Sequence, residues 1–184
     1  MNNTTKANPA PIGLLGFGMT TILLNVHNAG FFPLDVVIMA MGITIGGIAQ
    51  IIAGILEYKN NKTFGTVAFT AYGFFWISLV LIWIMPKLGL GEPHSPLSFG
   101  LYLLLWGIFT FGMFIATLKS LTISKLVFGS LFILFILLAL ANFTGSHLIH
   151  TIAGYDGILC GAFAVYEAIA QVINEAYGRK VCPV

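Results

Sequence analysis

Six runs of apolar residues, each long enough to cross a lipid bilayer, follow one another along this chain with only short polar connections. A hydrocarbon core of about 30 Å requires about 20 apolar residues in a helix, and lipid leaves the backbone no partners outside the helix. The sequence therefore predicts an all-α membrane protein with a six-helix transmembrane domain at 9–177, between tails at 1–8 and 178–184. The predicted spans are residues 9–27, 35–57, 64–85, 97–118, 122–143 and 152–176.

The scarcity of charge excludes a soluble domain. Charged residues make up 8% of the chain, against about 25% in a typical soluble protein. The net charge of +2 and the lack of a basic cluster make nucleic acid an unexpected partner. Cys160 lies within an apolar run and Cys182 near the end of the chain, so neither a disulfide framework nor a cysteine metal site is expected.

The positions of the cations predict the orientation. If the spans alternate in direction, only Lys87 falls on one side of the membrane, and positive residues favour the cytoplasmic side. Both termini are therefore predicted to lie in the cytoplasm of a multi-pass protein in a bacterial inner membrane. The cations on the predicted cytoplasmic side are Lys6, Lys59, Lys62, Lys119, Lys125, Arg179 and Lys180.

Catalytic motifs are not evident. The chain has no Walker loop, no HExxH, no GxSxG and no dinucleotide fingerprint. His147 and His150 are three residues apart, but no third metal ligand is evident. The sequence therefore predicts no enzyme activity, no metal and no cofactor.

Polar residues within the spans are the candidates for a transport path, because such groups are costly in lipid and usually line a path or the bundle interior. The amides of Gln50 and Asn142 need several hydrogen-bonding partners, which favours a wet cavity. The hydroxyl of Thr20 can also be satisfied by a neighbouring helix or its own backbone. Three carboxylates are candidates for proton linkage: Glu57, Asp156 and Glu167.

The start of the first span is the most informative local feature. It reads Asn8-Pro9-Ala10-Pro11-Ile12-Gly13-Leu14. Proline suits a first helical turn, where its missing N–H costs nothing, and asparagine is a suitable N-cap. The free N–H groups of such a turn can attract a carboxylate. The alternative is an ordinary capped start of a helix.

These seven residues resemble the NPAPLGL signature of the acetate uptake transporters, the succinate–acetate permeases, with Ile12 in place of leucine. The order of further blocks also resembles the family, and its enterobacterial members most of all, over residues 8–183. These blocks are Gly46-Gly47-Ile48-Ala49-Gln50, Ala53-Gly54 with Glu57, Thr63-Phe64-Gly65, and Tyr72-Gly73-Phe74-Phe75-Trp76. Lys62 departs from the asparagine common in the family.

The resemblance implies a urea-channel-like bundle of six helices in a homohexamer, with a path through each protomer for acetate and, in some members, succinate. It implies an apolar constriction built by Phe17, Tyr72 and Leu131. These residues lie eight, eight and nine positions from the predicted starts of their spans, which places them at a similar depth of about 12–14 Å. Asn8, Pro9, Pro11 and Gly13 are expected to lie along the path.

The leading functional hypothesis is proton-linked uptake of acetate and related small carboxylates. No lysine or arginine lies deep in a span, so an anion would depend on neutral donors, on helix N-termini or on crossing as the neutral acid. A passive carboxylate channel without proton coupling is the alternative. A structural membrane protein without transport remains a third reading.

Overall fold

The computed structural model describes residues 7–184, so Lys6 and most of the N-terminal tail lie outside the described residues. The helices are α1 (Ala10–Asn28), α2 (Val36–Met41), η1 (Gly42–Ala49), α3 (Gln50–Lys59), α4 (Thr63–Ile84), η2 (Pro86–Leu88), α5 (Pro96–Thr117), α6 (Thr122–Thr144) and α7 (His147–Ala176). Since α2, η1 and α3 are continuous, the described chain has six helices long and apolar enough to cross a membrane. The prediction of an all-α six-helix protein is confirmed.

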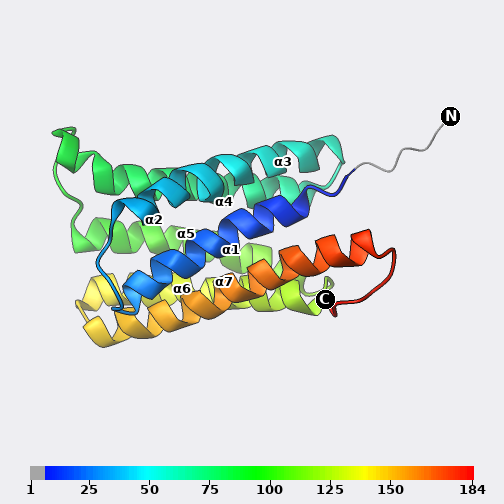
Figure 1. Ribbon diagram of the computed structural model, residues 1–184. Coiled ribbons are helices and arrows are strands. Elements are labelled where there is room, and N and C mark those ends of the chain that lie inside the picture. The colour runs from blue at the N-terminus through cyan, green and yellow to red at the C-terminus, as the bar shows by residue number, and fades with distance from the viewer. Residues whose placement is uncertain (1–6) are drawn as a thin grey trace.

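The six spans run side by side along one direction (Figure 1), and their contacts with one another close them into a ring of antiparallel neighbours. Helix α1 lies between α7 and the span built of α2, η1 and α3. Helix α4 packs against that span on its other side, while α6 packs between α7 and α5. Contact between α4 and α5 is slight. This order leaves a space inside the bundle that residues from several spans can line.

The ends of the spans are fixed by local hydrogen bonds. The Asp35 carboxylate accepts from the backbone N–H groups of Val37 and Ile38 at the start of α2. Ser95 and Ser98 form a capping box at the start of α5, and Ser146 caps α7 by accepting from the Ile149 N–H. These side chains satisfy backbone donors that would otherwise lack partners at a helix start.

The second span contains a π-helical segment, η1 (Gly42–Ala49), which the apolar pattern of the sequence did not reveal. A π segment within an α-helix is rare and often marks a functional site. Here it directly precedes Gln50, the first residue of α3.

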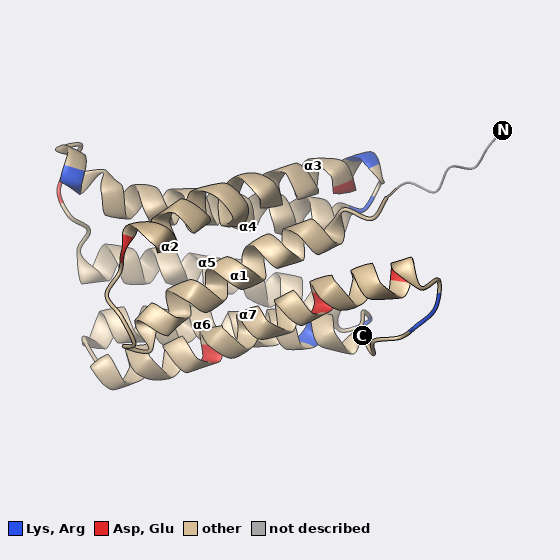
Figure 2. Cartoon of the chain, viewed as in Figure 1, with Lys and Arg blue, Asp and Glu red and all other residues tan. Residues whose placement is uncertain are grey.

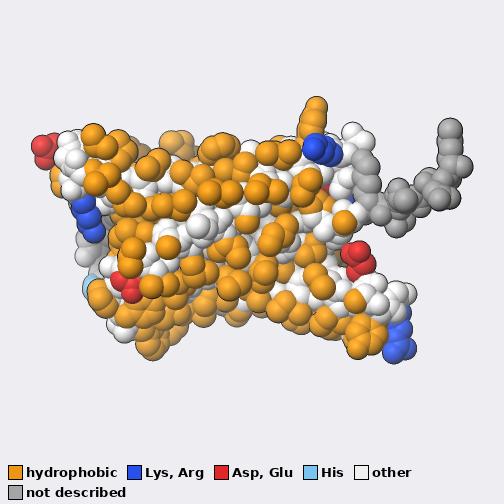
Figure 3. Space-filling view, turned by 45° about the horizontal axis from the view of Figure 1, so that its top comes forward, with side chains coloured by type: hydrophobic (Ala, Val, Ile, Leu, Met, Phe, Trp, Pro, Cys, Tyr) orange, Lys and Arg blue, Asp and Glu red, His pale blue; other side chains and the backbone are white. Residues whose placement is uncertain are grey.

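Charged side chains lie mainly at the two ends of the bundle (Figure 2). One end, here called the basic end, holds Lys59, Lys62, Lys119, Lys125, Arg179 and Lys180 at or next to helix termini. Lys87 lies in η2, which follows the end of α4 and so lies at the opposite end. Hydrophobic side chains cover most of the face between the ends in Figure 3, as lipid contact requires. The orientation with the basic end in the cytoplasm remains a prediction.

Glycines allow α1 and α7 to approach closely. A Cβ atom at Gly18 would lie 2.7 Å from the carbonyl oxygen of Gly161, and a Cβ at Gly161 would lie 2.7 Å from that of Gly18. Because backbone atoms cannot move aside as a side chain does, the two glycines set the separation of the helices. Small residues at such crossings are typical of membrane bundles.

Replacing Gly161 by alanine is expected to destabilise the bundle by about 1–3 kcal/mol, because the added methyl group overpacks the crossing. Gly112→Ala is the matched control, since a Cβ there meets nothing within 4 Å, and we expect a change of no more than about 0.5 kcal/mol. Thermal unfolding of the two purified variants in detergent measures the difference. Equal midpoints would contradict this account of the α1–α7 crossing.

Candidate functional site

Three cavities within the bundle share lining residues and thereby form a series. The first, here called the histidine-end cavity, has a volume of about 150 Å³ and is lined by His27 and His150 among others. The second, the central chamber, measures about 20 Å³. The third, the basic-end cavity, measures about 790 Å³ and is lined by Lys62 and Lys119 among others. The series runs from one end of the bundle towards the other.

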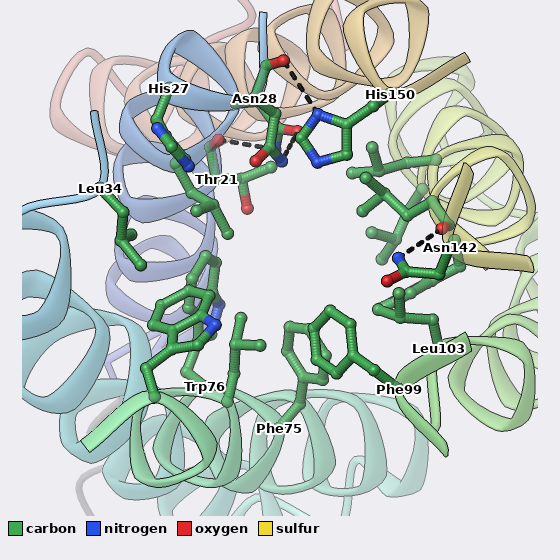
Figure 4. A pocket seen from close by; sticks show the side chains of 18 of the residues that line it. Thr21, His27, Asn28, Leu34, Phe75, Trp76, Phe99, Leu103, Asn142 and His150 are labelled. Atoms are coloured by element: carbon green, nitrogen blue, oxygen red, sulfur yellow. Dashed lines mark hydrogen bonds between the residues drawn. The ribbon is translucent and has the colours of Figure 1, made fainter. Parts of the chain in front are cut away.

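The histidine-end cavity receives side chains from α1, α4, α5, α6 and α7 (Figure 4). Apolar and aromatic groups such as Phe75 and Leu103 form much of its wall. Its polar groups form hydrogen bonds with nearby residues. Asn25 donates to the Thr21 carbonyl at 2.9 Å, and Asn28 Nδ2 donates to Asn25 Oδ1 at 3.0 Å. His150 Nδ1 lies 3.2 Å from the Asn28 carbonyl oxygen, and Asn142 donates to the Leu138 carbonyl at 2.9 Å.

One donor in this wall is unused. The indole Nε1 of Trp76 is buried and has no hydrogen-bonding partner among residues 7–184. An indole N–H can only donate, so it is suited to a molecule that brings an acceptor into the cavity. A carboxylic acid or a carboxylate brings such an oxygen.

The border between the histidine-end cavity and the central chamber is apolar, and it is here called the first neck. Phe17 and Leu131 line both spaces, and Tyr72 lines the chamber beside them. The rings of Phe17 and Tyr72 lie 6.0 Å apart between centroids. The three residues that the sequence placed at a similar depth thus line one chamber.

The hydroxyl group of Tyr72 is already engaged. It lies 2.8 Å from the hydroxyl oxygen of Thr110, which itself donates to the Trp106 carbonyl at 2.7 Å. Since Thr110 has one hydroxyl proton, Tyr72 is the donor in the first of these bonds. Tyr72 therefore presents its ring to the neck while its proton is held towards α5.

A second apolar neck separates the central chamber from the basic-end cavity. Leu14, Ala68, Phe69 and Phe128 line both spaces. A Cβ atom at Gly13 would overlap the Phe69 ring, so the glycine of the α1 motif leaves room for this ring. The sequence did not indicate the second neck, because these residues are ordinary apolar side chains in apolar helices.

Two carboxylates lie at the basic-end cavity. Glu57 is 1% exposed, and its Oε2 lies 3.9 Å from the Lys62 ammonium. Glu167 Oε1 accepts from Ser124 Oγ at 2.7 Å and from Gln171 Nε2 at 3.3 Å. The other oxygen of each carboxylate, Glu57 Oε1 and Glu167 Oε2, has no hydrogen-bonding partner in the described part of the chain. Each can therefore accept one further proton or donor.

Asn8 joins the start of α1 to this network. Pro9, directly before α1, already has helical dihedral angles (φ −84°, ψ −11°), so Asn8 lies at the start of the helix, where a capping side chain is expected. Asn8 Oδ1 accepts from the Ala10 N–H at 3.2 Å, while its Nδ2 donates to Gln171 Oε1 at 2.8 Å. The motif thus ties α1 to α7 at the basic end.

The other predicted site residues have separate places. Asn142 lines the histidine-end cavity and Gln50 the central chamber. Thr20 lines none of the three cavities: it donates to the Gly16 carbonyl at 2.8 Å and packs beside Gly46. Asp156 also lies away from the cavities, on α7. A surface groove between α1 and α7 is lined by Asn8 and Pro11, whereas Pro9 serves as the N-cap residue.

The model of the GPR1/FUN34/yaaH family matches residues 1–181. The chain belongs to the GPR1/FUN34/YaaH family. Within the family, it is 56% identical to the succinate-acetate/proton symporter SatP of Escherichia coli K12 over 184 residues, which are 100% of this chain and 98% of that protein. It is 36% identical to the ammonia transport outward protein 2 of Saccharomyces cerevisiae over 174 residues, 90% of this chain and 61% of that protein.

A solved structure described as the bacterial acetate channel SatP has the same fold as this GPR1/FUN34/YaaH protein. It superposes with a TM-score of 0.97 at 56% identity, over 98% of this chain and 99% of the other. Together with the six apolar helices, this places the protein in the membrane as a multi-pass inner-membrane protein. The E. coli relative is named as a symporter and the solved structure is described as a channel, and neither is described as an enzyme.

Proposed function

We propose that the protein transports acetate and also succinate across the inner membrane, and that this transport is coupled to protons. In this proposal the protein is a transporter and not an enzyme. The observation that carries the proposal is the series of three cavities joined by two apolar necks inside one six-helix protomer. The names of the E. coli symporter and of the solved channel support the choice of substrate. The positive-inside rule supports a cytoplasmic basic end.

In this proposal the neck of Phe17, Tyr72 and Leu131 sets the size of molecule that passes. Apolar walls disfavour a hydrated ion, because removing water from a bare carboxylate costs far more than removing it from the neutral acid. The large basic-end cavity gives the acid a wet exit beside Glu57 and Glu167, which are placed to exchange protons there. We also propose that six protomers assemble as a homohexamer, each with its own path.

A passive channel without proton coupling is the second candidate. It is favoured by the central chamber, where Tyr72 is the only titratable side chain among the described lining residues and its proton is engaged with Thr110. A chamber with no free carboxylate provides no obvious relay for a proton moving separately from the substrate. Flux measurements separate the two candidates.

Purified protein in liposomes is expected to accumulate labelled acetate when the lumen is made alkaline at equal total acetate on both sides. For one proton per acetate, a gradient of one pH unit corresponds to about 1.4 kcal/mol and so to about tenfold accumulation. Initial rates are compared with those of protein-free liposomes, because acetic acid also permeates lipid. A protein-dependent rate that follows only the total acetate gradient would establish the passive channel instead.

A further inference from the structure

Among the residues that the structure describes, Gln50 is the one amide that lines the central chamber. It is the first residue of α3 and only 1% exposed, and it lines the chamber opposite apolar residues of α1, α4 and α6. Among the described lining residues, the only other polar side chain is that of Tyr72, whose proton is donated to Thr110. Any polar group that stops between the two necks therefore meets Gln50.

The amide of Gln50 has an unused acceptor. Its Oε1 is buried and has no hydrogen-bonding partner within residues 7–184. Leaving such an atom unpaired destabilises the folded protein, and native proteins rarely retain one without a role. The chamber measures about 20 Å³, enough for a small polar group to reach Gln50 Oε1. An O–H group that enters the chamber supplies the donor that Gln50 Oε1 lacks.

A neutral carboxylic acid matches this amide better than a carboxylate does. The acid carries one O–H donor and one carbonyl acceptor, while the amide carries a carbonyl acceptor and N–H donors, so the two can pair through two hydrogen bonds. A carboxylate can only accept. It would leave Gln50 Oε1 unpaired and facing a negative charge, and no described lysine or arginine lines the chamber to offset that charge.

We infer that Gln50 is a specificity-determining residue that binds the protonated, neutral form of the substrate acid between the two necks. This inference rests on the proposed passage of acetate through the protomer. The carboxylate takes up one proton from water in the cavity at one end, crosses the chamber as the acid, and returns that proton at the other end. No net charge crosses the chamber, and the proton travels on the substrate rather than on a separate relay.

Gln50→Met tests the role of the amide, because methionine is unbranched and of similar length but lacks the amide donor and acceptor. Loss of these two hydrogen bonds is expected to lower the protein-dependent acetate flux about tenfold or more. The variant should be at least as stable as the native protein to thermal unfolding, since an unpaired buried carbonyl has been removed. A merely structural role for Gln50 predicts the opposite, a lower unfolding midpoint.

Two further measurements use the protein in liposomes. The membrane potential is clamped at different values with potassium and valinomycin, and the native acetate flux is expected to be the same at each value. If acetate crossed as an anion, its accumulation at equilibrium would change about tenfold for each 60 mV. Acetamide, a neutral analogue with N–H donors and a carbonyl, is expected to inhibit acetate flux in the native protein and to lose that effect in Gln50→Met.

The outcomes separate this inference from the proposed function. Acetate flux that follows the membrane potential, or a Gln50→Met variant with native flux and native inhibition by acetamide, overturns the role of Gln50 while acetate transport stands. No protein-dependent acetate flux in the native protein overturns acetate transport itself. Potential-independent flux that Gln50→Met reduces, together with lost inhibition by acetamide, establishes the inference.

Discussion

Replacing Ala68 by phenylalanine is expected to reduce acetate uptake to the rate of protein-free liposomes. Ala68 is 2% exposed and lines both the central chamber and the basic-end cavity. A phenyl ring at this position fills the second neck, because the chamber beside it measures only about 20 Å³. Initial uptake of labelled acetate into liposomes measures the effect.

Ala116→Phe is the matched control, since Ala116 lies exposed on α5 and lines none of the three cavities. Overpacking at Ala68 costs about 1–3 kcal/mol, so thermal unfolding of both variants is measured beside uptake. Ala68→Leu provides a smaller obstruction, and we expect an intermediate rate from it. Native uptake by a folded Ala68→Phe protein would place the acetate path outside this series of cavities.

Leu131→Ala is expected to change which acid passes. The side chain is 3% exposed and lines the central chamber together with Phe17 and Tyr72, with which it forms the first neck in the proposed function. Shortening it widens the neck, so lactate, which is larger than acetate, should gain more than acetate does. Because one methylene group in an apolar pocket changes discrimination about tenfold or more, we expect the ratio of lactate to acetate uptake to rise by about that factor.

The control for this substitution is Leu140→Ala on the same helix, where the side chain is 44% exposed. The loss of a buried leucine costs about 2–5 kcal/mol in a closed core, so both proteins are checked for unfolding before uptake is compared. If Leu131→Ala keeps the native preference for acetate over lactate, Leu131 does not set the size limit.

Much of the fold was predictable because a bilayer allows few solutions. Apolar runs of the required length identified the six spans, and the spacing of Phe17, Tyr72 and Leu131 from the span starts gave them one depth. That depth is a property of position along a helix, so sequence alone could suggest it. That the three side chains line one chamber depends on how each helix is rotated, and only the structure supplies this rotation.

Other features depend on contacts between distant residues. Asn8 and Gln171 are 163 positions apart, and neither the composition nor the spacing of the sequence pairs them. Thr20 shows the reverse case, because its polar side chain within a span is satisfied by its own helix and lines no cavity. The second neck escaped prediction for a simpler reason: Phe69 and Phe128 differ from other apolar residues only in where the fold places them.

The π-helical segment η1 also changes how this chain should be aligned with its relatives. A π turn contains more residues than an α turn. Each extra residue rotates all later side chains by about 100° around the helix axis. A helical wheel drawn through 36–59 as one α-helix therefore assigns the wrong faces to residues after Ala49. Within this span, an alignment gap of one residue therefore means that different side chains of the following helix face inward. Insertions and deletions at Gly42–Ala49 thus deserve to be read as rotations of α3 rather than as changes of length.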